Sequence, residues 1–144
     1  MAAPGIEGAC IELEITESAM IHNDHVVDTI RMLQNRGIKV SVDDFGTGYS
    51  SFGQLRRHRF DALKVDKSFV DAIAFDKSSA TLVKAMIQMA HDLGLRVIVE
   101  GVETREQVEI LRDYGCDEIQ GYYYSRPVPP EEFETLLRQG VTMA

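Results

Sequence analysis

Short apolar runs alternate with amphipathic segments along most of the chain. The runs are rich in Val, Ile and Leu, which is typical of buried β-strands. They lie at Cys10–Ile15, Ile38–Val42, Ala62–Val65, Arg96–Val99 and Glu118–Tyr122. Between them, apolar residues recur at helical spacing. Strands that alternate with helices predict an α/β fold, with a parallel sheet covered by helices.

The expected helices have clear start and stop signals. Their starts are predicted at Asn23 or Asp24, at Ser78 or Ser79, at a capping box of Thr104 and Gln107, and at Pro129 and Pro130. Their ends are predicted near Gly37, Gly94 and Gly140, because glycine commonly terminates helices.

Two architectures fit five strand–helix units. One is an open doubly wound sheet. The other is an incomplete (β/α)8 barrel, which normally needs about 250 residues. We expect a short tail at residues 1–9 and one domain at residues 10–140, with an abrupt start that suggests strands upstream.

Polar side chains gather where the predicted strands end. They are Glu14 and Glu17, Asp43 and Asp44, Lys64 and Asp66, Glu100 and Glu103, and Gln120. The carboxyl ends of parallel strands meet at one edge of a sheet, which is where sites form in α/β folds. We therefore expect these side chains to share one site, whereas Tyr122, Tyr123 and Tyr124 are predicted to be strand residues.

Several carboxylates that converge at one edge of the sheet repel each other unless a cation compensates their negative charge. Hard oxygen donors favour Mg²⁺ or Mn²⁺ over Zn²⁺, and the four histidines lie in helical or connecting segments. Two bound metals would suit phosphodiester hydrolysis. Lys64 is expected either to orient a water or to serve as a structural partner of the acids.

Composition narrows the possible functions. The 144 residues carry a formal net charge of −8, which argues against a DNA- or RNA-binding protein. No apolar run approaches the length of a membrane helix, and no signal peptide is visible. Cys10 and Cys116 match no metal or redox spacing, so we expect reduced thiols and a cytoplasmic protein.

Five motifs together resemble the EAL-domain phosphodiesterases of bacteria. They are Leu13-Glu14-Ile15-Thr16-Glu17-Ser18, Val42-Asp43-Asp44-Phe45-Gly46-Thr47-Gly48-Tyr49-Ser50, Leu63-Lys64-Val65-Asp66, Val99-Glu100-Gly101-Val102-Glu103 and Ile119-Gln120-Gly121-Tyr122. The resemblance implies a (β/α)8-type barrel that hydrolyses cyclic di-GMP to pGpG with Mg²⁺ or Mn²⁺.

The same resemblance implies a role for each matching residue. The implied metal ligands are Glu14, Asp43, Asp44 and Glu100. Lys64 is implied to position the attacking water, and Glu100 to ligate metal or to act as the base. Glu17 resembles the glutamate that holds the loop after the paired aspartates, while Glu103 and Gln120 match positions near the substrate.

The sequence departs from the family pattern at its start. The Glu-Ala-Leu tripeptide and an upstream metal-binding asparagine are absent, so the chain resembles the C-terminal portion of an EAL domain and is expected to be weak or inactive alone. One alternative is a degenerate module that binds cyclic di-GMP or a protein partner without catalysis. Another alternative is a receiver domain. In receiver domains, however, the paired acids sit on the first strand, whereas here the pair follows the second run.

A partial barrel would leave two strand edges open, at the first and fifth runs. Unpaired edges recruit other chains. The inner face of such a sheet is also expected to expose apolar residues that a closed barrel buries. Both features predict a homo-oligomer.

Overall fold

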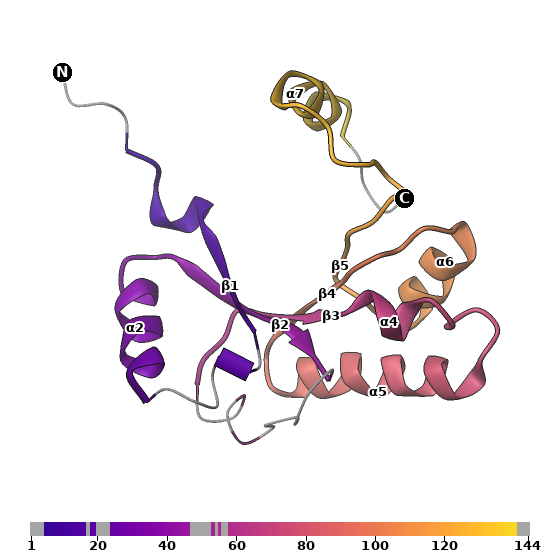
Figure 1. Ribbon diagram of the computed structural model, residues 1–144, viewed down its shortest axis with the longest axis horizontal. Coiled ribbons are helices and arrows are strands. Elements are labelled where there is room, and N and C mark those ends of the chain that lie inside the picture. The colour runs from indigo at the N-terminus through magenta and orange to yellow at the C-terminus, as the bar shows by residue number, and fades with distance from the viewer. Residues whose placement is uncertain are drawn as a thin grey trace.

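A five-stranded parallel sheet forms the centre of the computed structural model, which describes residues 5–16, 18, 19, 24–46, 53, 55 and 58–140 (Figure 1). The strands are β1 (Glu12–Thr16), β2 (Lys39–Phe45), β3 (Ala62–Val65), β4 (Arg96–Val99) and β5 (Glu118–Ile119). The predicted α/β class is therefore confirmed. Glu17 and most of the connection between β2 and β3 lie outside the described residues.

The strand order decides between the two predicted architectures. Neighbours in the sheet follow the chain order β1-β2-β3-β4-β5, and all four pairings are parallel. A doubly wound sheet reverses its order at a switch point, whereas a barrel adds each strand on the same side of the last. The order is that of a (β/α)8-type barrel, and the described sheet is not closed.

Helices connect the strands and follow them. They are α2 (Asp24–Gln34), α4 (Lys67–Val70), α5 (Lys77–Asp92), α6 (Arg105–Asp113) and α7 (Pro130–Gln139), and a short 3₁₀ turn, η1 (Gly8–Cys10), precedes β1. Figure 1 shows α2 and α5 on the same side of the sheet, with α7 well away from both. No helix among the described residues has the length and apolar character needed to cross a membrane.

The hydrophobic core lies between the sheet and its helices. Alternate residues of each strand point to the same face, and one set is almost completely buried. That set includes Val40, Val42, Leu63, Val65, Val97 and Val99, which share a core with Val83, Ile87 and Ala90 of α5. The other set faces the opposite, concave side of the sheet.

The helix ends confirm most of the predicted signals. Thr104 and Gln107 form the capping box of α6, and Gly37, Gly94 and Gly140 have positive φ angles after their helices. The prediction of Ser78 or Ser79 as the cap of α5 is wrong. Asp76 is the cap, because its carboxylate accepts hydrogen bonds from the backbone N–H groups of both serines.

Three of the five strands have bounds that differ from the predicted runs. Cys10 belongs to η1 rather than to β1, and β2 continues through Asp43 and Asp44 to Phe45. The prediction that the three tyrosines continue the fifth strand is wrong, because β5 ends at Ile119 and residues 122–124 form a turn.

A close backbone contact explains this early end of β5. The N–H of Val102 donates to the carbonyl oxygen of Gln120 (3.1 Å), and the Val102 carbonyl accepts from Tyr123 (3.0 Å). A Cβ atom on Gly121 would lie 2.1 Å from the Val102 carbonyl oxygen, so only glycine lets the chain turn here. The glycine therefore ends the strand and redirects the chain toward α7.

Candidate functional site

The concave face of the sheet is polar. Alternation along the strands assigns it Glu12, Glu14, Thr16, Lys39, Ser41, Asp43, Ala62, Lys64, Arg96, Ile98, Glu100, Glu118 and Gln120. Only Ala62 and Ile98 are apolar in that set. The prediction of an apolar inner face is therefore wrong for the described strands. Most positions on this face carry acidic, basic or other polar side chains instead of apolar ones.

Lys64 lies at the centre of the acidic cluster. Its side-chain nitrogen Nζ is 2.5 Å from Oε1 of Glu14 on β1 and 2.6 Å from Oε1 of Glu100, which follows β4. Oδ1 of Asp43 lies 3.8 Å from the same nitrogen. The lysine is only 4% exposed, whereas its carboxylate partners stay partly open to water.

Opposing effects act on the Lys64 ammonium. Burial lowers its pKa, but hydrogen bonds to Glu100 and Glu14 and the charges of Glu100 and Asp43 raise the pKa, with a net increase. Lys64 is therefore a cation at neutral pH. The distances show that Lys64 is an ion-pair partner of these acids. Its role in orienting a water molecule stays a prediction.

A β-bulge in β2 lies at Asp43 and Asp44, across from this lysine in the strand register. The register between β2 and β3 shifts between Val42 and Phe45, so two aspartates occupy the space opposite Lys64. Asp44 has a φ of 55°, a left-handed conformation that Asp tolerates better than most residues. The Asp44 N–H donates to Oδ1 of Asp43 at 2.9 Å. Backbone outliers of this kind cluster at functional sites.

The remaining predicted residues occupy the rim. Glu103 pairs with Lys67, and its N–H donates to the Gln107 side chain. Asp66 caps α4, and the hydroxyl and N–H of Ser68 lower the pKa of its carboxyl group. The structure therefore brings together Glu14, Asp43, Lys64 and Glu100, and it places Asp66 and Glu103 in local contacts beside them.

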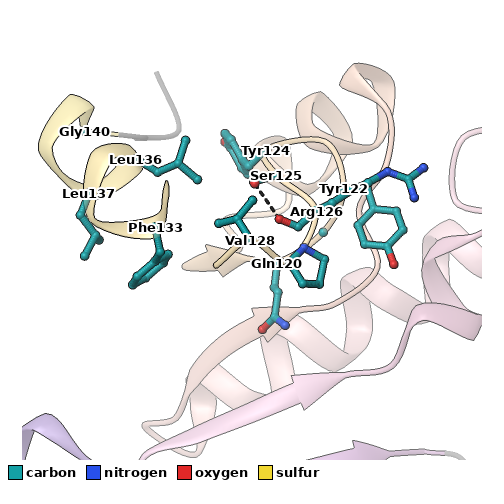
Figure 2. Close-up of a pocket in the computed structure, with 12 residues that line it drawn as sticks. Gln120, Tyr122, Tyr124, Ser125, Arg126, Val128, Phe133, Leu136, Leu137 and Gly140 are labelled. Carbon is teal, nitrogen blue, oxygen red and sulfur yellow. Dashed lines mark hydrogen bonds between the residues drawn. The ribbon is translucent and has the colours of Figure 1, made fainter. Parts of the chain in front are cut away.

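Gln120 borders two cavities at the end of β5. One, of about 490 Å³, also contacts Glu14 and Lys64. The other, of about 660 Å³, lies between α7 and the segment that follows β5, and its walls include Tyr124, Val128, Phe133 and Leu136 (Figure 2). In Figure 2 the Gln120 side chain points away from α7 and toward the sheet.

Sequence reasoning missed a second cation on the concave face. Arg96 pairs through Nη2 with Oε2 of Glu12 on β1 at 3.0 Å, and through Nη1 with Glu118 on β5. The available signal was a basic residue at the start of an otherwise apolar strand. Spacing along the sequence gives Arg96 no role, because Glu12 and Glu118 are far from it in the chain.

The carboxylate oxygens of Glu14, Asp43 and Glu100 suit a hard divalent cation in kind. Among the residues that the structure describes, however, no three His, Cys, Asp or Glu side chains are grouped so as to hold a metal ion. Lys64 stands between the carboxylates instead. The donor chemistry fits a metal, whereas the described positions show a lysine-centred ion-pair cluster.

Comparison with known proteins identifies this arrangement. The sequence profile of the EAL domain matches residues 2–127. The chain belongs to the EAL domain family. The cyclic di-GMP phosphodiesterase NbdA of Pseudomonas aeruginosa is 44% identical over 135 residues, which cover 93% of this chain and 17% of that protein. The chain thus spans about a sixth of that relative's length.

Solved EAL structures share the fold. The EAL domain of Mycobacterium smegmatis DcpA is 38% identical with a TM-score of 0.85, and the match covers 91% of this chain and 59% of that one. A complex of Klebsiella pneumoniae BlrP1 with manganese and cyclic di-GMP is 33% identical with a TM-score of 0.79, covering 85% and 31%. Another BlrP1 complex contains calcium.

Proposed function

We propose that this EAL chain contributes a metal-dependent phosphodiesterase site that hydrolyses cyclic di-GMP to pGpG in bacterial second-messenger signalling. The observation that carries the proposal is the convergence of Glu14, Asp43 and Glu100 on Lys64. Membership of the EAL family and the cyclic di-GMP complexes of related structures support it.

Four carboxylates would hold the divalent cations in this proposal: Glu14, Asp43, Asp44 and Glu100. When bound, Mg²⁺ or Mn²⁺ would activate a water and neutralise charge on the phosphate. The ammonium of Lys64 would hold the attacking water by hydrogen bonding, and Glu100 would accept its proton. Glu17 would support the loop after Asp44, and Glu103 and Gln120 would lie against the substrate.

A second candidate is a non-catalytic module that binds cyclic di-GMP or a protein partner. One observation favours it: the Lys64 ammonium pairs with all three carboxylates and so compensates part of their charge. A cluster that is balanced in this way can persist as a structural element. The two candidates differ in whether product forms.

The deciding experiment uses the 144-residue chain with Mn²⁺ and cyclic di-GMP. Calorimetric titration measures Mn²⁺ binding, and chromatography measures pGpG. We expect Asp43→Asn to weaken Mn²⁺ binding and to abolish any turnover, whereas Asp113→Asn, on the exposed surface of α6, should change neither. Cyclic di-GMP binding without pGpG would establish the non-catalytic module. A parent chain that binds neither ligand would refute both candidates.

Two further properties belong to the same proposal. β1 and β5 are the edge strands of the described sheet, so we expect homo-oligomers that form through these edges. Light scattering at micromolar concentration tests this, and a monodisperse particle of 16.1 kDa would refute it. Both cysteines are free thiols, which supports a cytoplasmic location.

A further inference from the structure

The ion pairs of Arg96 join strands that are not neighbours. β1 and β4 are separated by β2 and β3. In a flat sheet, three strand spacings would amount to about 14 Å. Nη2 of Arg96 nevertheless lies 3.0 Å from Oε2 of Glu12. The two side chains therefore meet across the concave face, above the two intervening strands.

Small residues lie on the path between the two partners. The strand register aligns Arg96 with Ala62 on β3, Ala62 with Ser41 on β2, and Ser41 with Glu14 on β1, two residues after Glu12. Ala62 and Ser41 are fully buried. Their short side chains leave room for the long arginine side chain to cross toward β1, which larger residues at these positions would obstruct.

The same guanidinium also reaches the other edge of the sheet. Nη1 of Arg96 pairs with Glu118 on β5. Arginine suits this task because its planar guanidinium carries several donors in a fixed geometry and can engage two carboxylates at once. One side chain thereby connects β1, β4 and β5.

Each connected strand carries a residue of the proposed site. Glu14 follows Glu12 by two positions, Gln120 follows Glu118 by two, and Glu100 follows Arg96 by four. Even separations along a strand keep side chains on the same face. Arg96, Glu12 and Glu118 therefore lie on the concave face, and each precedes a residue of the proposed site on, or directly after, the same strand.

We propose that Arg96 is a positioning residue: by tying β1 and β5 to β4 across the concave face, it sets the place of Glu14 relative to Glu100 at the cation site. This inference rests on the proposed function, because it assigns these carboxylates to metal binding. It names a role for a residue whose ion pairs, with Glu12 and Glu118, lie outside the Lys64 cluster.

The test measures Mn²⁺ affinity by calorimetry and thermal unfolding by circular dichroism, at a temperature where every variant is folded. We expect Arg96→Gln to weaken Mn²⁺ binding by roughly tenfold, the lower end for the loss of a group that orients metal ligands. Arg96→Lys should recover part of the Mn²⁺ affinity, because lysine keeps the positive charge but lacks the planar guanidinium that engages two carboxylates at once.

A matched control separates positioning from the general loss of an ion pair. Arg105 pairs with Glu109 on the exposed surface of α6 at 2.9 Å, and Arg105→Gln should leave Mn²⁺ affinity unchanged. Glu12→Gln should weaken binding in the same direction as Arg96→Gln. A variant that combines Arg96→Gln with Glu12→Gln should bind Mn²⁺ no more weakly than Arg96→Gln alone, because both changes remove the same contact.

An Mn²⁺ affinity of Arg96→Gln within about twofold of the parent would overturn the inference, and so would a lowered unfolding temperature without a change in affinity. If Arg96→Gln does not fold, Glu12→Gln carries the test under the same criterion. Asp43→Asn, measured in parallel, separates the two claims. If Asp43→Asn binds Mn²⁺ more weakly than the parent and Arg96→Gln does not, the positioning role is refuted and the proposed function stands. If the parent chain does not bind Mn²⁺, the proposed function is refuted as well.

Discussion

Among the residues that the structure describes, Lys64 is the one cation within 4 Å of Glu14, Asp43 and Glu100, and replacing it with methionine removes that charge. Methionine preserves much of the volume of the buried stem but carries no charge. Glu14, Asp43 and Glu100 would then face one another without the ammonium that now lies 2.5, 3.8 and 2.6 Å from them. We expect Lys64→Met to destabilise the fold.

The magnitude follows from how much of each partner is exposed to water. Breaking a fully buried ion pair costs about 3–5 kcal/mol, whereas an exposed pair is worth at most about 1 kcal/mol. Here the lysine side chain is 5% exposed, but Glu14 is 52% exposed and Glu100 is 23% exposed. Water therefore screens part of the repulsion, and we expect a loss of about 2–3 kcal/mol.

The pH dependence of this loss has a defined sign. The folded-state pKa of Lys64 is raised, since the hydrogen bonds and charges of its partners outweigh burial. Its stabilisation is therefore fully present below the ordinary lysine pKa, and it disappears only as the pH rises through the raised value. The difference in unfolding free energy between parent and variant should be the same at about pH 7 and about pH 9.

Urea unfolding monitored by circular dichroism measures the difference. The matched control is Lys84→Met on α5, where the ammonium lies over the Tyr114 ring, 5.3 Å from its centre. That change should cost less than about 1 kcal/mol. If the two variants lose equal stability, Lys64 does not hold the acidic cluster together and the reasoning fails.

Three further substitutions test individual contacts by urea unfolding. Ser41→Ala should be neutral or stabilising by up to about 1 kcal/mol, because the Ser41 hydroxyl is buried without a hydrogen-bond partner among the described residues; a clear loss would reveal a partner. Gly121→Ala should cost at least about 2 kcal/mol, because its Cβ would lie 2.1 Å from the Val102 carbonyl oxygen; a smaller loss would mean that the turn relaxes. Burial raises the pKa of Asp117, but its hydrogen bonds with the Val97 N–H and with His91 lower the pKa by more, so the net pKa is depressed. Asp117→Asn should therefore be less stable than the parent at neutral pH, and the gap should close as the pH falls below about 4; a gap independent of pH would contradict this.

Local sequence signals predicted the elements of this fold well. β3 and β4 have the predicted bounds, and the capping box of α6 forms as expected. These features depend on residues close together in the chain. The alternation of strands and helices also predicted the parallel sheet, while the choice between two architectures needed the observed strand order.

The features that sequence reasoning missed depend on contacts between distant segments. Glu12 and Arg96 are 84 residues apart in the chain and meet only because the sheet curves. The end of β5 depends on the approach of Gly121 to Val102. The bulge at Asp43 and Asp44 depends on the register with β3. Propensity and spacing within one segment carry no information on such contacts.

The charge balance of the concave face bears on how the proposed substrate would bind. Among the described residues, the ion pairs on this face involve two cations and five carboxylates: Lys64 and Arg96 with Glu12, Glu14, Asp43, Glu100 and Glu118. An anionic phosphodiester that approaches this face meets an excess of negative charge, and like charges at close range repel. Divalent cations would reverse the local sign. We therefore expect this chain to bind cyclic di-GMP with Mn²⁺ present and to lose that binding when a chelator removes the metal. Calorimetric titration with and without the chelator measures this, and equal affinity in both conditions would show that the nucleotide avoids the acidic cluster.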